Sequence, residues 1–98
     1  MHRILLVEDN KPNQMVAVGT LHKMGYAVQI ADSGADAVRM HLAVQYEAIL
    51  MDVMMPGLDG YEATRQIRDN ETVHGLVPVP VIGLSARALP QDLSLIHI

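Results

Sequence analysis

Short apolar segments alternate with amphipathic ones along the chain. Residues 4–7 (ILLV) and 48–51 (AILM) are apolar throughout, a pattern typical of strands that are buried on both faces. Residues 28–30 (VQI) alternate apolar and polar positions, as in a strand nearer the edge of a sheet, and residues 79–84 (VPVIGL) predict a further strand. The segments between these strands are long enough to hold helices.

Helices are predicted between the strands because start signals precede segments with helical spacing. Asn10 and Pro12 indicate the start of the first helix and Gly25 its end, and Ser33 is the predicted N-cap of the second. Such helices are expected to pack an apolar stripe on the sheet. The residues predicted for the stripes are Ala17, Leu21 and Met24 in the first helix and Ala35, Val38 and Leu42 in the second.

A third helix is predicted to begin at a capping box. Residues 59–62 (DGYE) place Asp59 at the cap and Glu62 three residues later. The helix is expected to run through Ala63 and Ile67 to about Arg68, and residues 69–78 are expected to form a loop. The alternation of strands and helices predicts an α/β domain, with a parallel sheet covered by helices on both faces.

Composition narrows the possible partners. The 98 residues suffice for one small domain, and the absence of cysteine removes thiolate metal sites and suits a cytoplasmic location. Lys and Arg total 7 against 11 Asp and Glu, the aromatic residues are 3 Tyr, and no apolar segment reaches membrane-spanning length. Direct contact with nucleic acid or with a membrane is therefore not expected.

Polar residues follow the predicted strands, at the edge where α/β sheets form their sites. Glu8 and Asp9 follow the first strand, Asp52 follows the third, and Ser85 follows the fourth. Clustered carboxylates repel one another unless a cation or a proton is present, and oxygen ligands suit Mg²⁺. A carboxylate can also act as a nucleophile and accept a phosphoryl group. These residues therefore predict a Mg²⁺ site with Asp52 as the reactive group.

Each polar residue also has a structural interpretation when it is taken singly. Asp9 alone would more often cap a helix, Ser85 alone would more often be a cap or turn residue, and the spacing of Asp59 favours capping over ligation. Packing is expected for Met54 and Met55, because no Cys or His accompanies them. The histidines lack ligand spacing and are expected in solvated or partly packed positions: His2, His22, His41, His74 and His97.

Several motifs together resemble the receiver domain of two-component response regulators. They are ILLVEDN (4–10), GYAVQIADSG (25–34), LMDVMMPGLDGYEATRQIR (50–68) and VIGLSA (81–86). NKPNQ (10–14) and EATRQIR (62–68) resemble, more narrowly, the receivers of hybrid histidine kinases. The resemblance covers about residues 3–92. It implies a flavodoxin-like, doubly wound parallel sheet with strand order 2-1-3-4-5.

The resemblance also implies a role for each site residue. Asp52 would be the phosphoacceptor, and Ser85 would be the switch hydroxyl, with the small residue Ala86 beside it. Mg²⁺ would be held by Glu8, Asp9, Asp52 and the backbone carbonyl of Met54. The phosphoryl donor would be a phosphohistidine on a histidine kinase or a histidine phosphotransfer protein. The receiver would switch a signalling surface; it is not expected to be an enzyme beyond slow autodephosphorylation of the complete domain.

The chain departs from the family pattern after its fourth predicted strand. Receivers carry a lysine at the end of a fifth strand, but the lysines of this chain, Lys11 and Lys23, both precede Asp52. The fifth strand and the last helix are expected to be missing, which leaves the order 2-1-3-4 and an exposed fourth strand. Residues 1–92 are interpreted as an incomplete receiver and residues 93–98 (LSLIHI) as a non-native tail. The chain is therefore expected to be an inactive fragment that folds poorly or aggregates.

Two alternative functions remain open beside the phosphoacceptor. The chain could be a degenerate receiver that acts as an interaction module without phosphorylation. It could also be a Mg²⁺-dependent hydrolase that works through an aspartyl phosphate, of the haloacid-dehalogenase kind. The hydrolase is disfavoured because that class has a second Asp two residues after the nucleophile, where this chain has Met54.

Overall fold

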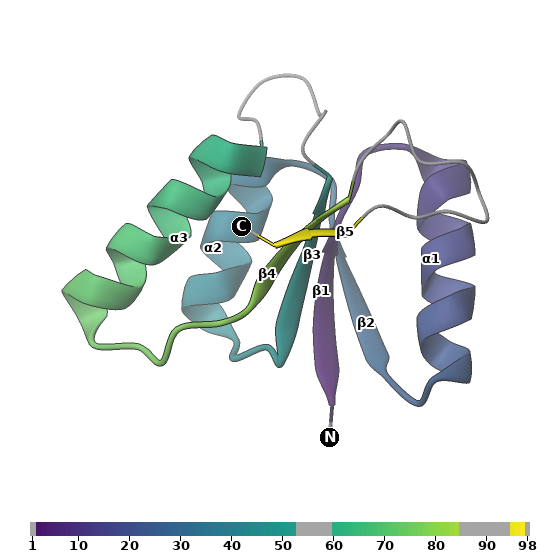
Figure 1. The fold of residues 1–98 in the computed structure, drawn as a ribbon, viewed down its shortest axis with the longest axis horizontal. Coiled ribbons are helices and arrows are strands. Elements are labelled where there is room, and N and C mark those ends of the chain that lie inside the picture. The colour runs from purple at the N-terminus through teal and green to yellow at the C-terminus, as the bar shows by residue number, and fades with distance from the viewer. Residues whose placement is uncertain (1, 53–59, 85–94, 98) are drawn as a thin grey trace.

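The computed structural model describes residues 2–52, 60–84 and 95–97, which form a single sheet with helices on both faces (Figure 1). The strands are β1 (Arg3–Val7), β2 (Ala27–Ala31), β3 (Ala48–Asp52), β4 (Val81–Leu84) and β5 (Leu95–His97). The helices are α1 (Lys11–Lys23), α2 (Gly34–Ala43) and α3 (Gly60–His74). The sheet order is β2-β1-β3-β4-β5.

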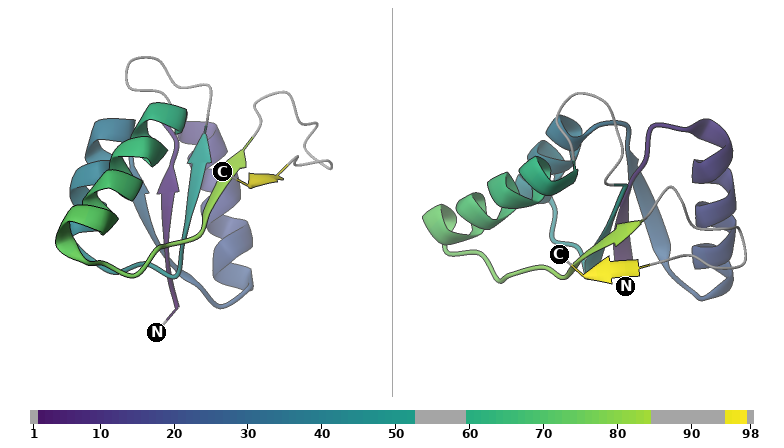
Figure 2. Two further views of the ribbon diagram at one scale, coloured as in Figure 1. Left: turned by 60° about the vertical axis from the view of Figure 1, so that its left-hand side comes forward. Right: turned by 45° about the horizontal axis from the view of Figure 1, so that its top comes forward.

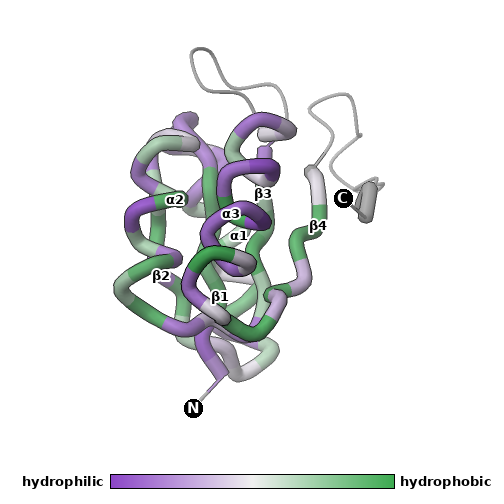
Figure 3. Tube along the Cα trace, turned by 90° about the vertical axis from the view of Figure 1, so that its left-hand side faces the viewer, coloured by the Kyte–Doolittle hydropathy of each residue, from purple (hydrophilic) through white to green (hydrophobic). Residues whose placement is uncertain are grey.

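The first four strands are parallel, and their order confirms the predicted flavodoxin-like arrangement 2-1-3-4. Helices α2 and α3 lie on one face of the sheet, and α1 lies on the other (Figures 1 and 2). The strands β1 and β3 lie between these layers (Figure 1), and the hydropathy colouring marks hydrophobic segments of the chain in green (Figure 3). Leu5, Ile49 and Met51 are fully buried, so the continuous apolar segments of the sequence form the centre of the core.

The helix starts follow the predicted caps. The side chain of Asn10 accepts a hydrogen bond of 3.0 Å from the backbone N–H of Asn13, with Pro12 in the first turn of α1. The Ser33 hydroxyl accepts one of 3.1 Å from the N–H of Asp36 at the start of α2. Gly25 follows α1 with a φ of +92°, a conformation that favours glycine.

The predicted apolar stripes of the first two helices are partly wrong. Met24 is 65 % exposed, and α1 buries Gln14 in addition to Leu21. Leu42 is 47 % exposed, whereas the preceding residue of α2, His41, is buried. A polar side chain can replace an apolar one on the buried face only where it finds partners there, and hydropathy alone does not reveal such partners.

His41 is buried because it meets a charged group of α3. Its Nε2 lies 3.4 Å from Oε2 of Glu71, which is 4 % exposed. The Glu71 carboxylate also accepts hydrogen bonds of 2.7 Å from Arg68 and from the backbone N–H of Val79, just before β4. We call His41, Arg68, Glu71 and Val79 the Glu71 junction. The junction joins α2, α3 and the approach to β4. The prediction that His41 is solvated or partly packed is therefore wrong, because its side chain is buried.

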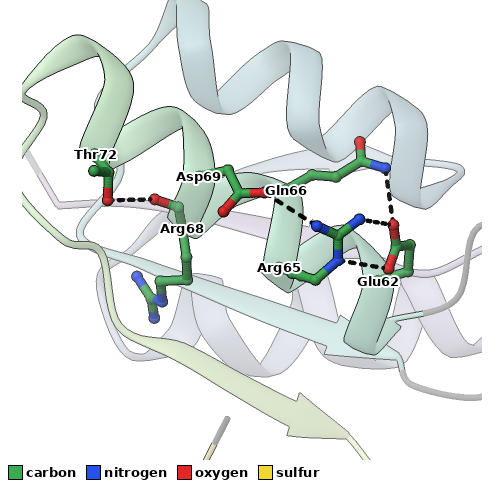
Figure 4. A network of polar contacts seen from close by, with 6 residues as sticks. All are labelled: Glu62, Arg65, Gln66, Arg68, Asp69 and Thr72. Carbon is green, nitrogen blue, oxygen red and sulfur yellow. Dashed lines mark hydrogen bonds and ion pairs between the residues drawn. The ribbon is translucent and has the colours of Figure 1, made fainter.

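Helix α3 extends to His74, so the prediction of a loop from residue 69 is wrong for its first turn and a half. Side chains spaced by one turn stabilise this extension (Figure 4). Arg65 pairs with Glu62 and, at 3.1 Å, with Asp69, while the Thr72 hydroxyl donates to the carbonyl of Arg68. The helix ends at Gly75, which has a φ of +64°.

The edge beside β4 also differs from the prediction. Among the described residues, β5 is a short strand from the segment that was interpreted as a tail, and it pairs with β4 in the antiparallel direction. Ile82 is opposite His97, and Leu84 is opposite Leu95. Strand β4 is therefore not an exposed edge, and the physical reason for predicting aggregation is weakened. No helix within the described ranges is long and apolar enough to cross a membrane.

Candidate functional site

Asp52 is the last residue of β3 and lies at the carboxyl edge of the parallel sheet. Strand register places it opposite Leu84 of β4, while the preceding residue Met51 is opposite Val7 of β1. Glu8 follows Val7 directly, so the chain leaving β1 passes beside Asp52. Asp52 is only 8 % exposed. Two neighbouring central strands therefore deliver acidic side chains to one point of the sheet edge.

The structure brings together Glu8, Asp9 and Asp52, the three acids that the sequence singled out. One carboxylate oxygen of each lies within 4.8 Å of the others. Glu8 is 6 % exposed, whereas Asp9 is exposed to solvent. The cluster thus combines two buried carboxylates with one that is open to solvent. A hard divalent cation that keeps part of its hydration shell requires such an oxygen-rich, partly open site.

The electrostatics of the cluster reflect the crowding of these acids. Burial raises the pKa of Glu8 from 4.5 to about 7, and the charge and hydrogen bond of Asp52 and the charge of Asp9 add to this rise. A hydrogen bond of 3.1 Å from the backbone N–H of Asn10 opposes it. Without a cation, the cluster therefore holds a proton near neutral pH. A bound cation would replace that proton, so the residues fit Mg²⁺.

A buried side-chain amide in α1 forms a hydrogen bond with the backbone of the loop that carries Glu8 and Asp9. Gln14 of α1 is 5 % exposed, and its Nε2 donates to the carbonyl oxygen of Glu8 at 2.5 Å and to Oδ1 of Asp32 at 3.0 Å. The sequence interpretation missed this residue. A signal was present, because Gln14 lies two helical turns before Leu21 and so shares its buried face.

The remaining predicted site residues fall outside the described part of the chain. Met54 and its carbonyl, Ser85 and Ala86 belong to this group, as does the predicted cap Asp59. Their roles stay predictions. A groove of about 570 Å³ lies elsewhere, between the end of α2 and the segment that precedes β4, and is lined by none of the three clustered acids. The chemistry of the acids, and not the size of a hollow, identifies the candidate site.

Comparison with known proteins gives consistent matches. The family model described as the response regulator receiver domain matches residues 4–94. The chain is similar to probable histidine kinase 1 of Oryza sativa subsp. indica, with 49 % identity over 69 residues, covering 70 % of this chain and 7 % of that protein. It also matches two-component system protein A of Emericella nidulans, with 45 % identity over 92 residues, covering 91 % of this chain and 13 % of that protein. The chain therefore spans only a small part of these relatives.

Solved structures agree with these matches. The receiver domain of a sensor histidine kinase from Pseudomonas aeruginosa PAO1, with a magnesium ion coordinated in its active-site cleft, is 47 % identical with a TM-score of 0.79. That match covers 91 % of this chain and 70 % of the other. The co-crystal structure of the Saccharomyces cerevisiae histidine phosphotransfer protein Ypd1 with the receiver domain of Ssk1 contains a match with 33 % identity and a TM-score of 0.81. It covers 93 % of this chain and 68 % of the other.

Proposed function

The chain belongs to the response regulator receiver domain family, and on that premise we propose that it accepts a phosphoryl group from a phosphohistidine onto Asp52. The observation that carries this proposal is the meeting of Asp52 with Glu8 and Asp9 at the carboxyl edge of the sheet, within 4.8 Å. A probable histidine kinase and the receiver domain of a sensor histidine kinase are among the proteins that this chain resembles, which supports the proposal.

The proposed step forms one bond and breaks another. An oxygen of the Asp52 carboxylate attacks phosphorus, the phosphorus–nitrogen bond to histidine breaks, and the imidazole leaves with the bonding electron pair. The product is an aspartyl phosphate. Bound Mg²⁺ would supply charge neutralisation for the transferred phosphoryl group. Glu8, Asp9 and Asp52 would hold it, together with the carbonyl of Met54, and Ser85 would act as the switch hydroxyl beside Ala86.

The kind of partner follows from the relatives. A phosphohistidine donor implies a histidine kinase or a histidine phosphotransfer protein, and the match to a structure that includes Ypd1 supports the second kind of partner. A cytoplasmic location is part of the same proposal and suits the cysteine-free sequence. Slow autodephosphorylation would complete the cycle in a domain with a full site. The chain would then act as a switch and not as a turnover enzyme.

The 98 residues contain no lysine after Asp52, and this affects the expected activity. An aspartyl phosphate carries concentrated negative charge that a nearby ammonium group would otherwise balance. We therefore propose that these 98 residues alone accept phosphate poorly and that activity requires a complete receiver C-terminus. A degenerate receiver that binds partners without phosphorylation is the alternative that the missing lysine favours.

One experiment separates these functions. The 98-residue chain and a version extended by a complete receiver C-terminus are treated with acetyl phosphate and Mg²⁺, and intact mass is measured. The extended version should gain one acid-stable, base-labile phosphoryl group that Asp52→Asn abolishes. Labelling that survives Asp52→Asn would refute the assignment of the acceptor. Absence of labelling in the extended version would favour the degenerate module, and steady release of phosphate with turnover would favour the hydrolase.

A further inference from the structure

We propose that Gln14 is a positioning residue, which fixes the loop that carries Glu8 and Asp9 in the form that binds a divalent cation. This inference rests on the proposed function, because it concerns the metal site of the same phosphoacceptor. It goes further by assigning a role to a side chain in α1 that touches neither the metal ligands' carboxylates nor the phosphoryl group.

The burial of Gln14 is unusual for its place in the chain. The residues around it on α1 are exposed, with Met15 at 76 % and Val16 at 70 %, whereas Gln14 is 5 % exposed. Burying an amide without partners is unfavourable, so a buried glutamine is expected to satisfy its polar atoms. Gln14 does so by donating from Nε2 to two acceptors that belong to different loops.

The chemistry of these acceptors fixes the direction of the amide. The backbone carbonyl of Glu8 and the carboxylate of Asp32 can only accept hydrogen bonds at these atoms. The nitrogen of Gln14 must therefore face them, and no other orientation of the amide would satisfy both. Glutamate at this position would place an acceptor against two acceptors, and methionine would fill the same space without a donor.

Glu8 makes further hydrogen bonds besides the one with Asp52, and one of them depends on Gln14. Its N–H donates to the carbonyl of Ala31 at 3.0 Å, and its Oε1 accepts from the N–H of Asn10 at 3.1 Å. Its own carbonyl accepts from Gln14 at 2.5 Å. The first bond holds Glu8 to β2 and the second closes its own loop. The Gln14 bond is the one that ties the Glu8 backbone to the body of α1.

The second bond of Gln14 extends the support to the loop after β2. Oδ1 of Asp32 accepts from Gln14 at 3.0 Å and lies 3.7 Å from Nζ of Lys11. One amide thus joins the end of β1, the helix α1 and the residue that follows β2. Carboxylates that bind a cation must be held in place against their mutual repulsion, and partners outside the ligand shell commonly provide that support.

A purely structural hydrogen bond would give a different result from a positioning bond. If Gln14 only adds stability, its loss should lower the unfolding midpoint and leave metal affinity unchanged in the folded fraction. If Gln14 positions Glu8, its loss should weaken Mg²⁺ affinity more than a control substitution that lowers the unfolding midpoint by the same amount. Thr64 offers the matched control, because it is also 5 % exposed and its hydroxyl donates to a backbone carbonyl, that of Gly60, at 2.7 Å.

The test compares Gln14→Met with Thr64→Val in the 98-residue chain and in the extended version. Mg²⁺ affinity is measured by titration calorimetry, and the thermal midpoint is measured in the same buffer. Gln14→Met should weaken Mg²⁺ binding by about tenfold or more, while Thr64→Val should change it by less than about twofold. Asp32→Asn keeps an acceptor for Gln14, so its Mg²⁺ affinity should stay close to that of wild type. The Mg²⁺ affinity of Asp32→Ala should lie between those of wild type and Gln14→Met.

A metal-free measurement keeps this inference separate from the proposed function. Hydrogen exchange of the Glu8 and Asn10 amides in EDTA should accelerate by about tenfold or more in Gln14→Met and stay unchanged in Thr64→Val. Equal Mg²⁺ affinity and equal exchange in Gln14→Met and wild type would overturn the inference. If the extended version with the wild-type residues binds no Mg²⁺ and gains no phosphoryl group, the proposed function fails, and amide exchange alone decides whether Gln14 fixes the loop.

Discussion

Replacing Glu71 with alanine should destabilise the fold more than any other single removal of a charge in the described residues, although Glu71 lies in a different layer from the acidic cluster. Its carboxylate is 4 % exposed and accepts hydrogen bonds of 2.7 Å from Arg68 and from the N–H of Val79. Truncation leaves the Val79 N–H buried without its acceptor, since Val79 is 5 % exposed. It also leaves a cavity where α2, α3 and the approach to β4 meet.

The magnitude follows from these contacts. An unsatisfied buried N–H costs about 1–3 kcal/mol, and removing one member of a buried ionic group commonly costs about 3–5 kcal/mol in total. Arg68 is 36 % exposed, so water can replace part of its lost partner, and the lower end of that range, about 3 kcal/mol, is expected. A domain of this size loses about 4–8 °C of thermal midpoint per kcal/mol. The expected fall is therefore at least about 12 °C.

Two further variants test the reasoning. Glu71→Gln separates the lost charge from the lost side-chain volume, and Glu62→Gln serves as a control at an exposed ion pair. Glu71→Gln keeps a carbonyl oxygen for the Val79 N–H but turns an amide nitrogen toward Arg68, so its midpoint should lie between wild type and Glu71→Ala. Glu62→Gln removes an acid from the exposed pair with Arg65 and should leave the midpoint nearly unchanged. The assay is thermal and urea unfolding followed by circular dichroism. The reasoning is refuted if Glu71→Ala and Glu62→Gln have the same midpoint.

Three other predictions concern the metal site, the sheet edge and a helix cap. In the metal-free chain, the pKa of Glu8 is raised from 4.5 to about 7, so its contribution to stability is present below pH 4.5 and is lost as pH rises through about 7. The thermal unfolding midpoint measured in EDTA should therefore decrease as pH rises over this range, and Glu8→Gln should remove that decrease. At pH values above about 7, added Mg²⁺ should raise the midpoint. Identical pH profiles of the midpoint in wild type and Glu8→Gln would contradict this. Deleting residues 93–98 should increase light scattering during purification, because β4 loses its pairing with β5; a deleted chain that stays monomeric would show that β5 does not protect this edge. Ser33→Ala should cost about 1 kcal/mol in urea unfolding through loss of the α2 cap, and an unchanged midpoint would exclude that role.

The hydropathy pattern was sufficient to predict the order of the elements and the parallel sheet. Short, fully apolar segments such as 4–7 and 48–51 are typical of strands buried on both faces, and helices between such strands favour parallel crossovers. The positions of Glu8, Asp9 and Asp52 followed from the same rule, because the carboxyl ends of parallel strands meet at one edge. Chain order alone therefore predicted that these acids would meet.

Features that depend on a partner from another element could not be read in this way. His41 was expected in a solvated or partly packed position because the histidines lack ligand spacing, and the sequence gave Gln14 no role. Both are buried because distant groups accept or share their hydrogen bonds: Glu71 for His41, and Glu8 and Asp32 for Gln14. Besides the side-chain pairs within the helix, α3 has a tertiary contact in its last turns, because Glu71 meets His41 of α2 and the N–H of Val79 before β4.

The sequence by itself determined which acids lie at the sheet edge, because that depends only on where apolar strands end. Only the tertiary structure decided how those acids are held, how strongly their charges interact and what pairs with β4. These properties depend on spatial distances between residues that are far apart in the chain. Gln14 and Asp32, for example, are separated by 17 residues in the sequence, yet their side chains form a hydrogen bond of 3.0 Å. A free energy that is set by burial and by partner geometry cannot be read from hydropathy, which records each residue's preference without its neighbours in space.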